Sequence, residues 1–397
     1  MLTKLGAKID FRELLDFYRR HLLEDVIPFW MKHAFNPTRG GIDTCLADDG
    51  SLLSTDRYMW SQMRAVWTFS ALYNRIEARE EWLDKALRIY RFAREHGRDE
   101  RRWWYYCLSA DGKLKEGPIS IYSDAFAIYG LTELVRATDD REVLDLAMET
   151  FEEVLPRIED WDTLLTAPYA IPKGCKAHGV SMIFSQTFDE LAQATDDPRI
   201  GEAVWFHSTE VMDHYLRPDR RLLFEYIGTD NALVDSPAGR AVVPGHAIES
   251  MWFQIHLLRR RGEEARIKRA VEAIRWHLEA GWDEEYGGIL LAIDAEGREP
   301  PYWKFADTKP WWIATEALYA LLLAYEITRE PWCLDWYRRV HEYAFTHYPD
   351  PEHGDWHQKL DRQGHVIDTV IALPVKDPYH LPRALINCIE VLERLAD

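Results

Sequence analysis

The feature that most constrains the fold is a repeat of short β-prone segments, each closed by an Asp/Gly or Asp/Asn turn signal. Five segments match in style, and their ends fall roughly 65 residues apart except for one gap of about twice that length,. Each copy is typical of a short hairpin or extended loop. The double gap predicts a sixth, irregular copy at residues 161–174. The five regular copies are residues 39–50, 101–112, 220–231, 286–297 and 353–364.

Helical patterns of two kinds alternate strictly between these segments. The first kind is amphipathic and indicates a helix half exposed to water. The second kind is apolar nearly all round, as in residues 311–325, where Glu316 is the single charge. A helix that is apolar on every side must be enclosed by other helices. The amphipathic ranges are 11–33, 80–96, 140–158, 198–216, 263–280 and 331–347, and the apolar ranges are 57–77, 119–137, 178–194, 245–258, 308–328 and 380–395.

This alternation predicts an all-α fold. Six inner helices wrapped by six outer ones close most simply into an (α/α)6 barrel, with short β-hairpin segments preceding the inner helices. No linker or low-complexity stretch interrupts the sequence, so we expect residues 1–397 to form one domain,. Because every β-prone segment precedes an inner helix, all six gather at one end of the barrel. We expect the pocket at that end.

Charge and composition exclude several classes of partner. The 48 Lys and Arg residues against 67 Asp and Glu give a net charge of -19, which repels nucleic acids and anionic membrane surfaces,. No apolar run is long enough to span a bilayer. The five cysteines form no disulfide or zinc pattern, and the N-terminus lacks a secretory signal, so we expect a cytoplasmic protein,. The 17 tryptophans favour flat ring substrates such as sugars.

A few polar side chains lie on the predicted inner helices, which are otherwise apolar. Burial of an ionisable side chain there costs free energy unless the side chain is paired or has a function. Arg64 lies in an aromatic, uncharged stretch, and His246 and Glu249 are three residues apart on one helix face,. Glu316 is isolated among apolar residues, and His380 begins the last inner helix. Taken singly, each is more often a structural residue than a catalytic one.

Together these residues predict acid–base chemistry. His246 and His380 project into the same lumen, and imidazole suits proton transfer in both directions near neutral pH. Two such bases flanking one carbon can remove a proton from one face and return it from the other. Arg64 can hold the oxyanion of the resulting enediolate, and Glu249 can orient His246 and fix its tautomer. This chemistry requires no metal and no cofactor, and no phosphate-binding, dinucleotide or HExxH motif is present,.

The same residues belong to a wider set that resembles the N-acylglucosamine 2-epimerase family in register from about residue 25 to 390. The resemblance implies an (α/α)6 barrel that acts on free aldoses by metal-independent deprotonation and reprotonation at C2, often as a homodimer. It implies that His246 and His380 are the acid/base pair and that Arg64 contacts substrate oxygens. The set is Phe29-Trp30, Arg39-Gly40-Gly41, Thr44-Cys45-Leu46, Trp60-x-Gln62-x-Arg64-x-x-Trp67, Gly245-His246-x-Ile248-Glu249, Trp282-Asp283-x-x-Tyr286-Gly287-Gly288, Lys309-x-Trp311-Trp312, Glu316-Ala317-Leu318 and His380-x-Pro382-Arg383.

By the same resemblance, Glu249, Glu316, Tyr122 and Trp312 are expected to bind substrate. The run Ser181-Met182-Ile183 looks like the Pro-Met-Ile of the N-acetylglucosamine epimerases, whereas His178 falls earlier than the histidine of members that act on cellobiose or mannose. We interpret His178 as structural. The stretch 303–310 departs from the family pattern, so we expect a different pocket rim.

We expect a monosaccharide, or else a disaccharide, as the substrate, with N-acetylglucosamine and N-acetylmannosamine as the first choice of pair. Aldose–ketose isomerisation of the mannose–fructose type and mannose–glucose 2-epimerisation are the nearest alternatives. From other classes, a barrel glycosidase would use Glu249 and Glu316 as its carboxylate pair. A non-enzymatic interaction protein is the remaining alternative.

Overall fold

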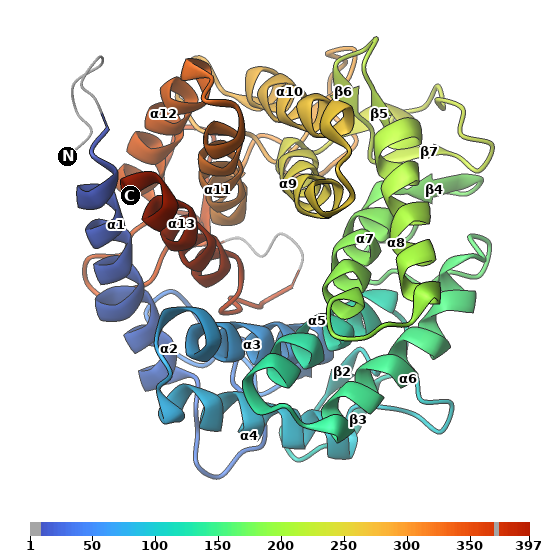
Figure 1. Cartoon of the computed structure of the whole chain (residues 1–397), viewed down its shortest axis with the longest axis vertical. Helices are drawn as coiled ribbons and strands as arrows, with labels where there is room; N and C mark the ends of the chain where they lie inside the picture. The colour runs from blue at the N-terminus through green and yellow to red at the C-terminus, as the bar shows by residue number, and fades with distance from the viewer. Residues whose placement is uncertain (1–8, 369–372) are drawn as a thin grey trace.

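The computed structural model describes residues 9–368 and 373–397 and has the predicted architecture, a ring of inner helices surrounded by outer ones (Figure 1). Each inner helix packs against the next, and the last contacts the first, which closes the ring. The (α/α)6 barrel is therefore confirmed. The inner helices are α3 (Met59–Ala71), α5 (Ile121–Thr138), α7 (His178–Ala192), α9 (Pro244–Arg261), α11 (Trp311–Thr328) and α13 (His380–Ala396).

The outer helices carry their charges toward solvent and their apolar stripe toward the inner ring, as the amphipathic patterns predict. In α10, for example, Ile267, Val271 and Ile274 are buried. The outer helices are α1 (Phe11–Arg20), α2 (Ile27–His33), α4 (Glu80–His96), α6 (Arg141–Ile158), α8 (Pro198–Thr209), α10 (Glu264–Gly281) and α12 (Pro331–His347).

The first outer helix was predicted to run unbroken over residues 11–33, and here the structure differs. A π-helical turn, His21–Val26, separates α1 from α2, and the Ile27 amide donates to the Leu22 carbonyl five residues earlier. Pro28 follows directly and has no amide hydrogen to continue the regular ladder, which accounts for the changed spacing. Two more π-helical turns, Leu72–Ile76 and Glu210–Tyr215, follow α3 and α8.

The β-prone segments form small antiparallel pairs that lie before the inner helices, as expected. Residues 159–174 contain no strand and make a single bridge, Ser120 to Thr166, which matches the predicted irregular copy. The strands are β1 (Arg57–Tyr58), β2 (Cys107–Leu108), β3 (Leu114–Glu116), β4 (Cys175–Ala177), β5 (Leu216–Arg217), β6 (Leu222–Leu223), β7 (Tyr226–Gly228), β8 (Ala241–Val242), β9 (Ile293–Asp294), β10 (Lys309–Pro310) and β11 (Lys359–Leu360).

The closing residue of each segment explains why the repeat was visible in the sequence. All six have left-handed backbone with φ between 70° and 93°, a conformation that favours Gly and Asn,. They are Gly50, Gly112, Gly174, Asn231, Gly297 and Gly364. Within residues 9–368 and 373–397, no helix is both long enough and apolar enough to cross a bilayer.

Candidate active site

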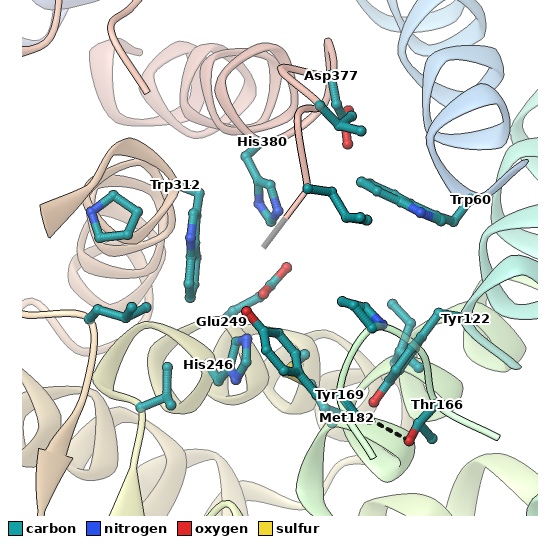
Figure 2. A pocket seen from close by; sticks show the side chains of 18 of the residues that line it. Trp60, Tyr122, Thr166, Tyr169, Met182, His246, Glu249, Trp312, Asp377 and His380 are labelled. Carbon is teal, nitrogen blue, oxygen red and sulfur yellow. Dashed lines mark hydrogen bonds between the residues drawn. The ribbon is translucent and has the colours of Figure 1, made fainter. Parts of the chain in front are cut away.

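A cavity of about 390 Å³ opens among the N-terminal ends of the inner helices, and this volume suits a small ligand,. Six of the seven predicted site residues line it, and Figure 2 shows five of them around the opening. The six are Arg64, Tyr122, His246, Glu249, Trp312 and His380. Glu316, the seventh, does not line the cavity and lies behind His380.

Two imidazoles meet at one indole ring. His246 is the third residue of α9, His380 is the first of α13, and Trp312 is the second of α11. The His246 ring stacks on Trp312 at a centroid distance of 5.2 Å, and the His380 ring lies 5.6 Å from the same indole. Figure 2 shows both imidazoles on the cavity side of the indole. Helices distant in sequence therefore bring the two predicted acid/base residues to one place.

His380 is held by a buried network of charges. Its Nδ1 lies 2.8 Å from Glu316 Oε1, and Arg383 Nη2 donates to the same oxygen at 2.8 Å. Burial lowers the pKa of His380 well below its ordinary value, and the cations Arg64 and Arg383 lower it further, against the opposing charge of Glu249,. His380 is therefore a neutral imidazole whose Nδ1 faces Glu316, which leaves Nε2 as the free basic nitrogen.

His246 has a different carboxylate partner from the one predicted. Its Nδ1 lies 3.1 Å from Glu225 Oε1, so the expectation that Glu249 orients His246 is wrong. Glu249 instead accepts a hydrogen bond from Arg383, which lies on α13. Burial disfavours the charged form of His246, but the charge and hydrogen bond of Glu225 outweigh burial and raise its pKa,. The pKa values of the two histidines are thus shifted in opposite directions.

Arg64 is fixed between aromatic rings and one acid. Its guanidinium lies 4.0 Å from the Phe126 ring centre, 4.6 Å from that of Tyr379 and 4.8 Å from that of Trp60. Its Nη1 donates to Asp377 Oδ2 at 2.9 Å, while its buried Nε has no hydrogen-bond partner among the described residues. Burial raises the pKa of Asp377 to about 6, although Arg64 opposes the shift. Arg64 is therefore held in a fixed position where it lines the cavity.

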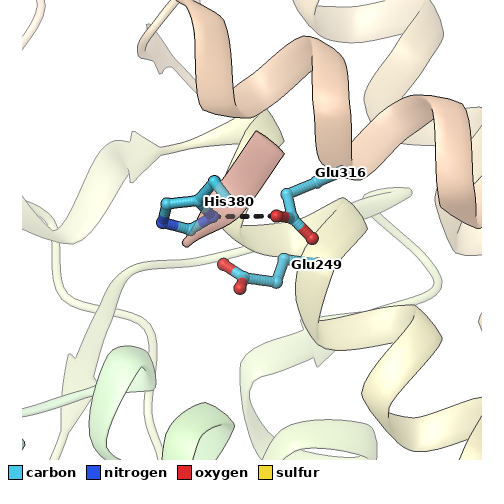
Figure 3. A group of neighbouring side chains, drawn as sticks. All are labelled: Glu249, Glu316 and His380. Atoms are coloured by element: carbon cyan, nitrogen blue, oxygen red, sulfur yellow. Dashed lines mark hydrogen bonds and ion pairs between the residues drawn. The ribbon is translucent and has the colours of Figure 1, made fainter. Parts of the chain in front are cut away.

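Glu249, Glu316 and His380 also form the one group of potential metal ligands found among the described residues (Figure 3). One ligand atom from each lies within 4.8 Å of the others. The guanidinium of Arg383 already bonds both carboxylates, so it supplies the positive charge that this acidic pair requires. A metal ion would have to displace a fully buried arginine, and the donor set therefore fits a metal poorly.

Aromatic side chains from the connecting segments form one part of the cavity wall. Tyr169 and Trp303 make an edge-to-face contact at 4.9 Å, and Tyr226 lies 6.5 Å from Trp303. All three line the cavity, so the stretch at 303–310 that departs from the family pattern does shape the rim. His178 is fully buried, lies 3.0 Å from Ser250 through Nε2 and does not line the cavity.

Two important partners were not singled out from the sequence. Glu225 lies in the segment 220–231, which was interpreted only as a short hairpin or extended loop, and Asp377 precedes the last inner helix. Glu225 follows the apolar run Leu222-Leu223-Phe224 and precedes Tyr226-Ile227, so it is an isolated charge like Glu316. The argument that identified Glu316 could have identified Glu225 as well.

The fold and this cavity define an (α/α)6-barrel protein with a paired-imidazole site at one end of its lumen. The sequence matches the N-acylglucosamine 2-epimerase (GlcNAc 2-epimerase) family over residues 40–384. The chain belongs to that family and is an enzyme of the isomerase class.

Named relatives agree with this assignment. The N-acylglucosamine 2-epimerase of Bos taurus is 29% identical, with 94% of this chain and 90% of the relative covered. The human N-acylglucosamine 2-epimerase is 28% identical, with coverage of 97% and 92%. Among solved structures, a cellobiose 2-epimerase from Bacillus thermoamylovorans superposes with a TM-score of 0.82 at 21% identity, covering 96% of this chain and 99% of that one. A D-mannose isomerase has a TM-score of 0.81 at 18% identity, with coverage of 98% and 100%. These two structures support the fold.

Proposed function

We propose that this enzyme is a sugar 2-epimerase that interconverts N-acetylglucosamine and N-acetylmannosamine through an enediolate. The observation that carries the proposal is the meeting of His246 and His380 at Trp312, in a cavity that Arg64 also lines. The N-acyl preference is supported by relatives named N-acylglucosamine 2-epimerase. It is supported further by Met182 and Ile183, which give the cavity an apolar wall for an acyl group.

The proposed reaction follows from the opposite pKa shifts of the two histidines. In the open-chain sugar the C1 carbonyl acidifies the C2–H bond. His380, whose pKa is lowered, accepts the C2 proton in one direction, and His246, whose pKa is raised, donates a proton to the opposite face,. In the reverse direction the two exchange roles. Arg64, which lines the cavity, stabilises the negative charge on the enediolate oxygens,.

The remaining predicted site residues have supporting roles in this proposal. Tyr122, Glu249 and Trp312 line the cavity and contact the sugar. Glu316 acts through His380, since it bonds Nδ1 and does not line the cavity. The glycosidase alternative has little support, because Glu249 and Glu316 both bond Arg383 and are not free to act as an acid/base pair.

The experiment is incubation in deuterated water of the enzyme with N-acetylglucosamine, N-acetylmannosamine, mannose, glucose and cellobiose, each followed by NMR. Conversion of one N-acetylhexosamine into the other, with deuterium at C2, is the expected result. A ketose product indicates aldose–ketose isomerisation instead, and conversion of mannose or a disaccharide alone refutes the N-acyl preference. His246→Asn and His380→Asn are expected to lose conversion, and exposed His365→Asn is the matched control.

We further propose that the chain forms one domain, acts as a homodimer without metal or cofactor, and resides in the cytoplasm. The five cysteines are all free and buried, which suits a reducing compartment,. Light scattering measures the oligomer, and calorimetry tests for a single unfolding transition. Unchanged activity after EDTA dialysis is expected, and a loss restored by a divalent cation contradicts the metal-free scheme.

A further inference from the structure

Glu225 lies between β6 and β7, where it lines the cavity and is held by backbone hydrogen bonds. Its side chain is buried, with the residue only 4% exposed. Its amide donates to the Ala241 carbonyl at 3.0 Å, and its carbonyl accepts from the His178 amide at 2.9 Å. The adjacent β4–β7 pairing continues this backbone ladder. The carboxylate therefore projects from a fixed point on the barrel end.

The carboxylate of Glu225 lies between two imidazoles. His246 Nδ1 is 3.1 Å from Glu225 Oε1, and His178 Nδ1 is 3.7 Å from the same oxygen. The second distance exceeds a hydrogen bond. His178 is fixed in turn by Ser250, whose Oγ lies 3.0 Å from its Nε2. These contacts connect His246 and Glu225, which line the cavity, to the fully buried His178 and Ser250.

We propose that Glu225 is a positioning residue that fixes the Nδ1–H tautomer of His246 and stabilises its imidazolium, with His178 and Ser250 supporting Glu225 from behind. A buried acceptor at Nδ1 directs Nε2 of His246 toward the cavity, which is the arrangement a proton donor needs. The link to turnover rests on the proposed function, but the effect on His246 does not.

The contrast between the two histidines supports this role. Glu316, the carboxylate that bonds His380, also forms an ion pair with Arg383. The positive charge of Arg383 offsets the effect of this carboxylate on the imidazole. Both ion-pair partners of Glu225 are imidazoles, so its charge acts on them. Although burial favours the neutral carboxyl, His246 and His178 lower the pKa of Glu225 to about 2. Glu225 is thus an anion throughout the working pH range.

Other charged and titratable groups around the pair do not replace Glu225. Near His246 they are Arg64 of α3, Glu249 of α9 and His380 of α13, and Glu249 is the weaker influence on His246. Near Glu225, burial raises the phenol pKa of the surrounding tyrosines, and it lowers the pKa of His277 to about 4, so all of these are neutral at pH 7. The tyrosines are Tyr122, Tyr215 and Tyr226.

The test is an NMR titration of ¹⁵N-histidine-labelled full-length enzyme without substrate, with the His246 signals assigned by comparison with His246→Asn. In Glu225→Gln the pKa of His246 is expected to fall by at least about one pH unit. The matched control is Glu133→Gln, which removes another buried carboxylate, one paired with Arg75 and Arg136. In the control the His246 titration is expected to stay unchanged.

The activity readout is the pH profile of kcat/KM in both directions with any sugar that the enzyme converts. In the reaction direction in which His246 donates the proton, Glu225→Gln is expected to shift the alkaline limb of this profile to lower pH. An unchanged His246 titration in Glu225→Gln overturns the proposal even if the enzyme epimerises sugars. A shifted titration without turnover of any sugar supports the role of Glu225 and refutes the proposed function instead.

If Glu225→Gln does not fold, Glu225→Asp keeps the charge at a longer distance. A smaller fall in the pKa of His246 is then expected, and no fall overturns the proposal.

Discussion

Replacement of Arg383 by methionine tests the buried charge network that holds His380. Arg383 is 1% exposed, and its Nη2 bonds both Glu249 and Glu316, while Nη1 donates to Tyr379 Oη at 2.6 Å. In Arg383→Met, two buried carboxylates face each other without a cation. Removing one partner of a buried ion pair costs about 3–5 kcal/mol of unfolding free energy.

This cost converts into a measurable shift of melting temperature. For a chain of 397 residues the unfolding entropy is about 0.8 kcal/mol/K, so Arg383→Met is expected to lower the Tm by roughly 4 to 6 °C,. The pKa of His380 is expected to rise, because Arg383 is one of the cations that hold it down. Epimerisation is expected to fall accordingly.

Differential scanning calorimetry with and without Zn²⁺ is the assay. In Arg383→Met the ligand atoms of Glu249, Glu316 and His380 become available to a metal, and Zn²⁺ at about 100 times its Kd adds roughly 2.7 kcal/mol,. Arg57→Met is the control, since Arg57 is equally buried and pairs with Asp43 at 2.7 Å. The control is expected to melt early without a zinc effect. A Tm of Arg383→Met within about 1 °C of wild type refutes the reasoning.

Two further predictions concern Arg64 and acid stability. In Asp377→Asn the carboxylate that anchors Arg64 loses its charge. The KM measured by initial rates is therefore expected to rise about tenfold, equivalent to about 1.4 kcal/mol, with an unchanged circular dichroism spectrum. An unchanged KM contradicts the role of Asp377. Burial lowers the pKa of His207 and His341 to about 3 and that of His277 to about 4. Because the unfolded chain takes up these protons below pH 6.5, stability is full above that value and is lost as the pH falls, by roughly 1–2 kcal/mol per histidine at pH 5. Guanidinium unfolding at pH 7 and pH 5 measures this loss of stability. Equal unfolding free energies at the two pH values contradict the prediction.

The sequence predicted the barrel because its constraints are local and periodic. A helix such as α11, whose residues 311–325 hold a single charge, can only lie inside other helices, and Glu316 is indeed 1% exposed,. The closing residue of each β-prone segment was also recognisable in the sequence, because few residue types adopt its left-handed conformation,. The common end of the inner helices then placed His246 and His380 in one lumen.

The partners of those histidines were harder to predict, because long-range packing chooses them. The spacing of His246 and Glu249 correctly placed both on one face of α9, yet Arg383, 134 residues further along the chain, draws Glu249 away. Glu225 reaches His246 from a segment that carries no helical period, so no spacing rule links the two. Apolar patterning alone also missed the helix interruption at His21–Val26, although Pro28, which lacks an amide hydrogen, is visible in the sequence,.

The most direct test of the two-base scheme is exchange of the C2 hydrogen with deuterated water in His246→Asn and His380→Asn, each incubated separately with N-acetylglucosamine and N-acetylmannosamine. Each variant keeps one of the two imidazoles at Trp312. We predict that neither variant interconverts the sugars and that each exchanges the C2 hydrogen of one epimer only, a different epimer for each variant. Interconversion by either variant, or exchange of the same epimer by both, contradicts the account.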